Sequence, residues 1–319
     1  MAWVEMGNKQ AEGGNVGHGI HGAFPGCEDF RVERLVISGI DNEPVLSRNA
    51  PGQREEEFCL FHKDMPSGDA YVSLLSERVE AGIKGRLPLP VVRFADGEYE
   101  FYSASLKCNG LYKQAESVEA IRAAFPAHAE ALRYLSMNGF MAPLLFPGNM
   151  RRRGWFRAFL GKKNGADSAL RFLAFLARYG IKPTGANYMP FYAVYAYLSG
   201  ERFAAAVDGK TVCVINSDFN EEECYGWFGR AGSQPRLVHA AISDSYTATR
   251  WDSMRDGVFS AVKEKPDCFL VGAGVGALQV CVDAARRFSV PAIDAGHIIN
   301  MMNGLERKSN GPRLYTFKR

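Results

Sequence analysis

The feature that most constrains the fold is the alternation of strand-like and helix-like segments in the last third of the chain. Apolar and β-branched runs typical of buried strands occur at 211–216, 237–243, 268–271 and 290–294. Between these runs apolar residues recur at helical spacing, for example at Trp251, Met254 and Val258. Strands that alternate with helices over short loops form a mostly parallel sheet with helices on both faces. We therefore predict an α/β fold.

The same pattern begins earlier in the chain and gives an expected domain organisation. Val72, Leu75 and Val79 have helical spacing, and the apolar run 91–94 that follows them predicts a strand. The segment of about 115–207 predicts a helical insertion. The expected parts are a flexible glycine-rich leader at 1–30, an N-terminal extension without an assigned role at 31–66, the α/β domain at 67–302 and a C-terminal tail at 303–319.

Composition excludes several classes of protein. The net charge of +3 is too small to indicate nucleic-acid binding, so no nucleic-acid partner is expected. No apolar run approaches the roughly 20 residues that span a bilayer, and the first residues lack the apolar core of a signal peptide. The seven cysteines are scattered and include no C-x-x-C pair, which argues against a disulfide framework and a zinc knuckle. We expect a cytoplasmic protein.

The predicted parallel sheet directs attention to the residues that follow its strands. In such sheets ligands bind outside the carboxyl ends of the strands. That rule selects the segments 96–98, 216–218, 272–276 and 294–297. These four segments hold the candidate site residues.

Asp96 and Glu98 are the first candidates, because two carboxylates flank one glycine directly after a strand. In an extended or turning backbone, residues two apart project to the same side, so both are expected to face one ligand. Carboxylate oxygens suit Mg²⁺ or Mn²⁺, which bridge to substrate phosphates. Gly97 allows a ligand to approach the backbone closely, and Arg93 offers a planar fork for a phosphate. The alternative is an ordinary Asp-Gly turn beside a solvated charge.

The glycines Gly272, Gly274 and Gly276 follow a predicted strand and open a predicted helix, an arrangement that can hold a phosphate. With Asp294 twenty positions after Gly274, the segment also matches a dinucleotide-binding fingerprint. An NAD(P)-dependent oxidoreductase that uses the 272–276 loop is therefore an alternative. Against it, few residues follow Asp294 to supply the further strands that such a fold needs.

Three other features have weaker functional interpretations. His297 follows a strand end, where it could accept a proton or donate to a phosphate. The segment 216–218 could contact a ribose or base, or could be an ordinary turn. The segment 151–163 interleaves cations with aromatic residues, which fits peripheral membrane contact, a basic flap over a diphosphate, or an exposed loop.

The motif Arg93-Phe94-Ala95-Asp96-Gly97-Glu98 resembles the R-F-G-D-G-E signature of bacterial glycosyltransferases with the GT-D fold. The segments 269–274 and 292–297 resemble that family's glycine loop and its D-x-G-H segment. The resemblance spans roughly residues 67 to 302. Two departures are Ala95, where glycine is common, and a longer aromatic and basic middle section.

The resemblance implies a Rossmann-like glycosyltransferase domain that transfers a sugar from a nucleotide-diphosphate-sugar donor, with a UDP-sugar expected first. It implies that Asp96 and Glu98 bind Mn²⁺ or Mg²⁺ and the diphosphate. Either Glu98 or His297 would then be the general base. The acceptor, a saccharide, glycoprotein or lipid-linked compound, stays open, and so does a non-catalytic nucleotide-binding module. Contact through 151–163 would place the protein at the inner membrane surface.

Overall fold

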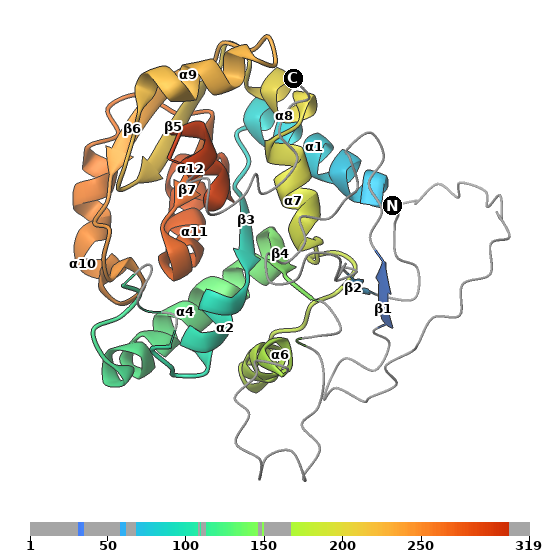
Figure 1. Cartoon of the computed structure of the whole chain (residues 1–319), viewed down its shortest axis with the longest axis vertical. Coiled ribbons are helices and arrows are strands. Elements are labelled where there is room, and N and C mark those ends of the chain that lie inside the picture. The colour runs from blue at the N-terminus through green and yellow to red at the C-terminus, as the bar shows by residue number, and fades with distance from the viewer. Residues whose placement is uncertain are drawn as a thin grey trace, which may run out of the picture.

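The computed structural model describes residues 68–107, 109, 113–145, 149 and 167–305, and the backbone of 31–34 and 58–61. The expected leader at 1–30, the basic segment 151–163 and the tail from 306 lie outside the described residues. Within the described part, a six-stranded sheet has the order β4-β3-β8-β7-β5-β6, and every neighbouring pair is parallel. The predicted α/β fold with a parallel sheet is confirmed (Figure 1).

The strands have these bounds: β3 Leu89–Phe94, β4 Phe140–Pro143, β5 Thr211–Asn216, β6 Arg236–Ala241, β7 Cys268–Gly272 and β8 Pro291–Asp294. A separate antiparallel pair is formed by β1 Arg31–Arg34 and β2 Phe58–Phe61. Each strand predicted from an apolar run in the last third is present to within two residues at either end.

The helices have these bounds: α1 Gly68–Gly85, α2 Asp96–Tyr102, α4 Val118–Asn138, α6 Ser168–Arg178, α7 Phe191–Leu198, α8 Glu201–Val207, α9 Glu221–Gly229, α10 Thr247–Ser260, α11 Ala277–Phe288 and α12 His297–Met302. A short 3₁₀ turn, η1, covers Gly274–Gly276. No helix in the described ranges is both long and apolar enough to cross a membrane.

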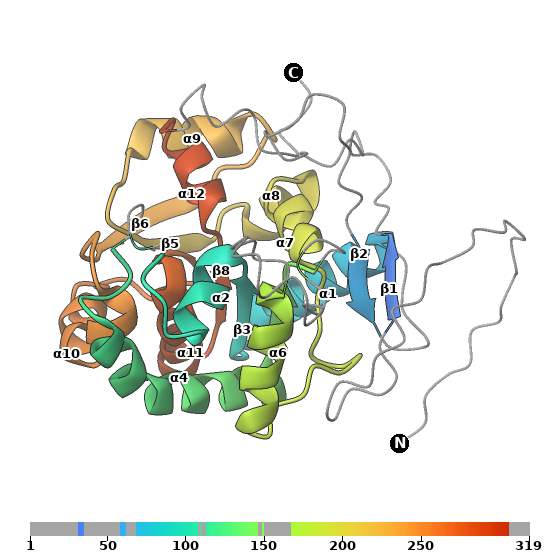
Figure 2. The same ribbon diagram turned by 60° about the horizontal axis from the view of Figure 1, so that its bottom comes forward.

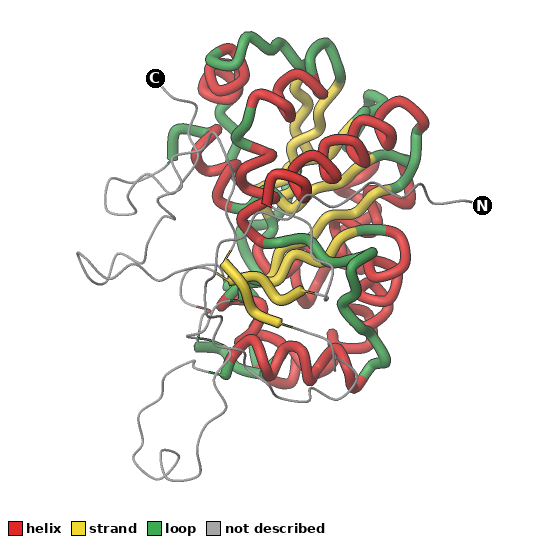
Figure 3. The backbone as a smooth tube through the Cα atoms, turned by 90° about the vertical axis from the view of Figure 1, so that its right-hand side faces the viewer, coloured by secondary structure: helices red, strands yellow, loops and turns green. Residues whose placement is uncertain are grey.

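Two groups of helices cover the sheet. The helices α4, α10 and α11 pack against one another, and α11 lies against β3, β7 and β8. The helices α1, α7 and α8 form a second group, in which α1 and α7 contact β3. Figures 1 and 2 show these groups on different sides of the strands, and the tube view in Figure 3 shows helices flanking the sheet. Helices therefore cover both faces, as right-handed crossovers between parallel strands require.

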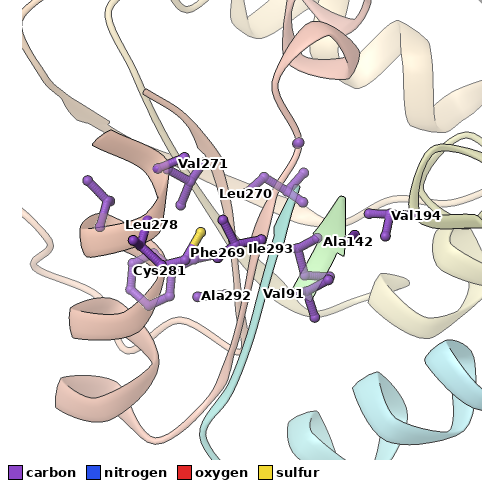
Figure 4. Packing of buried hydrophobic residues seen from close by; sticks show 14 of the residues in the cluster. Val91, Ala142, Val194, Phe269, Leu270, Val271, Leu278, Cys281, Ala292 and Ile293 are labelled. Carbon is purple, nitrogen blue, oxygen red and sulfur yellow. The ribbon is translucent and has the colours of Figure 1, made fainter. Parts of the chain in front are cut away.

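The core is centred on the middle strands. Val91, Phe269 and Ile293 are fully buried, and Cys281 and Leu278 of α11 pack against this region (Figure 4). Cys213, Cys268 and Cys281 are buried and free, and contribute to this core. Burial on both faces explains why these strands appear in the sequence as continuous apolar runs rather than as an alternating pattern.

The middle third differs from the prediction in one element. The segment from about 115 to 207 contains mostly helices, but it also contains β4, the edge strand that pairs with β3 in the register Val91 to Phe140. Sequence reasoning missed this strand, because its apolar run contains a proline, has no β-branched residue and lies between segments with helical spacing. The sheet therefore extends one strand beyond β3, and the carboxyl end of β3 lies inside the sheet rather than at its edge.

Candidate functional site

The central feature of the candidate site is a buried ion pair that joins two distant parts of the chain. Arg93 lies on β3 and Asp294 ends the neighbouring strand β8. The Arg93 Nη2 atom donates to Asp294 Oδ1 at 3.0 Å, and Nε donates to the Asp294 carbonyl at 2.8 Å. The backbone N–H of Arg93 also donates to Asp294 Oδ2 at 3.2 Å. Three hydrogen bonds therefore connect the two strand ends.

Aromatic side chains of α7 complete the surroundings of Arg93. Its guanidinium carbon lies 4.3 Å from the ring centre of Tyr195 and 5.1 Å from that of Phe191. Arg93 is 6% exposed and Asp294 is 5% exposed. Burial opposes the charge of Arg93, but the charges of Asp294 and Tyr195 raise its pKa above the usual value. Burial raises the pKa of Asp294, and Arg93 opposes that shift. Arg93 is thus engaged within the protein.

The backbone of Gly296 lies against the Arg93 guanidinium, which leaves no room for a side chain at this position. Its φ is +43°, and a Cβ built there would lie 1.9 Å from Arg93 Nη2. The left-handed conformation and the close guanidinium both disfavour any side chain. His297, the next residue, begins α12 and is half-buried at the same edge of the sheet.

The segment 96–102 forms helix α2 directly after β3, which changes the relation between Asp96 and Glu98. The expectation that both carboxylates project to one side is wrong, because residues two apart on a helix do not face each other. Glu98 turns back over the helix start, where its Oε2 accepts the Ala95 N–H at 2.8 Å. Gly97 lies in the first turn, and a Cβ there would meet nothing within 4 Å.

Glu98 has a raised pKa. Burial raises its pKa to about 7, and the negative charge of Asp294 adds to the shift, while the Ala95 N–H and Arg93 oppose it. A carboxyl group with a pKa near neutrality can exchange a proton at physiological pH. Glu98 therefore belongs electrostatically with the Arg93–Asp294 pair rather than with Asp96.

Asp96 is exposed, and its closest acidic partner is Glu100. Burial of its surroundings raises the pKa of Asp96, and the charge of Glu100 raises it further. The two are four residues apart on α2 and so share one helix face. One Glu100 oxygen lies 3.7 Å from Arg171 Nη2, whereas Oε2 is buried without a hydrogen-bond partner among the described residues. Helical spacing from Asp96 could have identified Glu100, but the segment was not predicted to be a helix.

The glycine loop after β7 is packed against neighbouring side chains. Gln114 Oε1 accepts the N–H of Val275 at 2.9 Å. A Cβ on Gly274, which has a φ of +53°, would lie 2.7 Å from Gln114 Nε2. A Cβ on Gly276 would lie 2.7 Å from Thr247 Cγ2, and one on Gly272 would lie 3.0 Å from Ile299 Cδ1. The loop therefore needs glycines for close packing, and Gln114, which sequence reasoning did not select, occupies one of its N–H groups.

The segment 216–218 lies at the carboxyl end of β5, beside the glycine loop. Asn216 is buried and donates through Nδ2 to the Asp218 carbonyl, and Asn303 Nδ2 donates to the same carbonyl at 2.7 Å. Ser217 and Asp218 are exposed. The chain runs from β5 to its neighbour β6 on one side, and from β7 to its neighbour β8 on the other side. The order of strands therefore reverses between β5 and β7, and ligands of α/β sheets bind at such a switch point.

The carboxyl edge therefore brings together most of the predicted site residues. Arg93 and Asp294 interact directly, and their charges act on Glu98. Asp96 lies one helix turn from Glu100, and the glycine loop contacts α2. Within the described ranges, no three His, Cys, Asp or Glu side chains converge as a ready metal site. A divalent cation bound here would need substrate oxygens besides the carboxylates of α2, which is how Mg²⁺ commonly binds.

Comparisons with known proteins do not assign a family. No protein-family model matches the chain, and no curated protein matches it. Two solved structures are similar to it, at 18% and 17% identity. One is described as a selenomethionine-substituted structure of domain of unknown function 1792, and the other as showing that this highly conserved domain has a distinct glycosyltransferase fold. Each match covers 74% of this chain and 84% of the other, with a TM-score of 0.41. Identities and TM-scores this low do not establish membership of a family.

Proposed function

We propose that the protein is a glycosyltransferase that takes a sugar from a nucleotide-diphosphate-sugar donor bound at the carboxyl edge of the sheet. The observation that carries the proposal is the direct bonding of Arg93 to Asp294. These residues belong to the two motifs that resemble glycosyltransferases, R-F-A-D-G-E and D-A-G-H, which lie about 200 residues apart in sequence. Two motifs that form one ligand site have to lie together at the carboxyl ends of the strands, where ligands of such sheets bind.

The chain's own residues have distinct roles in this proposal. Asp96, exposed at the start of α2, faces the donor, and the N–H groups of Gly97 and its neighbours can approach the diphosphate. Glu98 is the candidate proton acceptor, because its carboxyl group is half-buried beside the Arg93–Asp294 pair. The acceptor hydroxyl gives its proton to Glu98, and its oxygen bonds to the anomeric carbon. The nucleoside diphosphate leaves with the electrons of the broken C–O bond. Arg93 is a positioning residue, since it holds Asp294 and the start of α12.

A divalent cation fits the exposed carboxylate of Asp96, with phosphate oxygens of the donor completing its shell. Mn²⁺ or Mg²⁺ bound there would neutralise the charge that builds on the leaving diphosphate. The charge of Glu100 raises the pKa of Asp96, and a cation bound to Asp96 would offset this repulsion.

The oxidoreductase alternative is disfavoured by the two features that first suggested it. In a dinucleotide site the glycine-loop N–H groups face the pyrophosphate, and the acidic residue after the next strand binds a ribose hydroxyl. Here Gln114 accepts the N–H of Val275, and Asp294 is bonded to Arg93. Both parts of the fingerprint are already engaged within the protein.

A donor screen tests the proposal. The full chain is incubated with Mn²⁺ and a panel of UDP-, GDP-, ADP- and CMP-linked sugars, and free nucleotide is measured with and without added acceptor mixtures. We expect nucleotide release from one donor in the wild type and none in Asp96→Asn. Release should be kept in Asp256→Asn, a matched change at an exposed aspartate of α10 that pairs with Arg287. Binding is measured independently of turnover by the change in unfolding temperature with each nucleotide plus Mn²⁺, and with NAD and NADP for comparison.

The results of these experiments distinguish the proposed glycosyltransferase from the two alternative functions. Stabilisation by a nucleoside diphosphate without any nucleotide release would favour a non-catalytic nucleotide-binding module. Stabilisation by NAD or NADP alone would favour an oxidoreductase. Release that survives in Asp96→Asn would contradict the role given to this carboxylate.

A further inference from the structure

A fully buried histidine, His128, connects the helix that carries the site carboxylates to two other helices. It lies on α4. Its Nε2 atom lies 2.8 Å from the carbonyl oxygen of Ala248 on α10. Its Nδ1 atom lies 2.9 Å from the hydroxyl of Tyr102, which is the last residue of α2. Both ring nitrogens are therefore engaged.

The partners of His128 decide which ring nitrogen carries the proton. A carbonyl oxygen only accepts, so Nε2 donates to Ala248. Burial lowers the pKa of His128 to about 4, so the imidazole is neutral at physiological pH and Nδ1 accepts the Tyr102 O–H. Burial raises the pKa of Tyr102, and the negative charge of Glu98 raises it further, so the hydroxyl stays protonated. The hydrogen bonds thus run in one direction, from Tyr102 through His128 to Ala248.

Helix α2 depends on contacts of this kind for its direction. It has 7 residues, and isolated helices shorter than about 12–15 residues are marginal in water. Its N-cap residue is Ala95, whose side chain makes no capping hydrogen bond. Two tyrosine hydroxyls anchor the helix instead: Tyr99 donates to the Leu144 carbonyl at 2.7 Å, and Tyr102 donates to His128.

Tyr102 is placed to control the site, because it follows Glu98 by one helix turn and shares a helix face with it. A shift of Tyr102 would therefore move the carboxyl group that the proposed function makes the proton acceptor, and Asp96 in the same first turn. We propose that Tyr102 and His128 are positioning residues that hold α2, and with it Asp96 and Glu98, in place for sugar transfer. The inference rests on the proposed function.

Two replacements of His128 separate its two hydrogen bonds. The side-chain oxygen of asparagine can take the place of Nδ1 and accept the Tyr102 hydroxyl, whereas the side-chain nitrogen of glutamine can take the place of Nε2 and donate to Ala248. His128→Asn therefore keeps the bond to α2, and His128→Gln keeps the bond to α10. Because each variant loses one bond, both should unfold at similar temperatures, and a role confined to stability would affect them alike.

Hydrogen exchange of the full chain measures the hold on α2 without any substrate. The reporters are the hydrogen-bonded backbone N–H groups of residues 99–105. We expect them to exchange about fivefold faster in His128→Gln and Tyr102→Phe than in the wild type, as loss of one hydrogen bond implies. His128→Asn should leave their rates near those of the wild type. So should Tyr225→Phe, a matched control that removes a hydroxyl bonded to the Leu237 N–H.

Nucleotide release, with the donor that the screen identifies, measures the consequence for the reaction. We expect kcat to fall about fivefold in His128→Gln and Tyr102→Phe, since the loosened helix carries the proton acceptor, and to be kept in His128→Asn and Tyr225→Phe. The recovery by asparagine is the result that a merely structural histidine would not give.

Unchanged exchange of residues 99–105 in both His128→Gln and Tyr102→Phe would overturn the inference, whether or not the wild type releases nucleotide. Equal acceleration in His128→Asn and His128→Gln would overturn it as well, and so would faster exchange with an unchanged kcat. If the wild type releases nucleotide from no donor, the proposed function fails and the role in sugar transfer fails with it, whereas exchange still decides whether the pair holds α2.

Discussion

Replacement of Glu98 by glutamine should change how the stability of the protein depends on pH. Burial raises the pKa of Glu98 from 4.5 to about 7, and each pKa unit corresponds to about 1.4 kcal/mol. The shift is therefore equivalent to about 3 kcal/mol. Because the folded-state pKa is raised, this contribution to stability is fully present below about pH 4.5 and is lost as the pH rises through about 7. Glutamine keeps an oxygen for the Ala95 N–H but cannot ionise.

The measurement is urea unfolding of the wild type and Glu98→Gln from about pH 4 to about pH 8, in the presence of a chelator so that no divalent cation binds. The free energy of unfolding of the variant, minus that of the wild type, should increase by about 3 kcal/mol over this range. Most of the increase should fall between about pH 4.5 and 7. Other ionisable groups contribute to both proteins and cancel in the difference.

A matched control is Glu222→Gln, at an exposed glutamate in the first turn of α9. This variant makes the same replacement of a glutamate by glutamine at an exposed position, outside the site. A flat difference for Glu98→Gln, or one that decreases as the pH rises, would refute the argument that burial at the start of α2 holds this carboxyl group near neutrality.

Two further predictions concern the backbone and the buried pair. Gly296→Ala should lower the free energy of unfolding by about 3 kcal/mol or more, because Gly296 has a positive φ and an added Cβ would displace the Arg93 guanidinium. Gly97→Ala should change the free energy of unfolding by no more than about 1 kcal/mol, in the stabilising direction, because an added Cβ there meets no other atom. Arg93→Met and Asp294→Leu should each cost about 3–5 kcal/mol, and the double variant should cost less than the two combined, because neither charge is then left buried alone. Urea unfolding measures all five variants, and additive costs in the double variant would contradict a direct pair.

The predicted strands were found because their burial leaves a direct pattern in the sequence. The runs 211–216 and 268–271 are apolar on both faces, since the sheet is covered by helices on both sides. β4 is also a buried apolar run, but it is short, contains a proline and has no β-branched residue. Its four residues become a strand only through pairing with β3, which is a tertiary contact.

The candidate site was predicted in part for a similar reason. Sequence reasoning selected Arg93, Asp96, Glu98 and Asp294 because each follows or ends a predicted strand. It could not show that Arg93 and Asp294 bond to each other, since strand order in the sheet brings them together across about 200 residues. Nor did it predict α2, whose helical spacing associates Asp96 with Glu100 and separates it from Glu98.

By itself the sequence determined the α/β class, the main strands and the residues at their carboxyl ends, because buried apolar runs and helical spacing are local properties of a chain. The tertiary structure alone decided which of those residues meet, how strongly each is buried and therefore which carboxyl group holds a proton near neutrality. Strand order and burial depend on contacts between distant segments, and the raised pKa of Glu98 arises from those contacts.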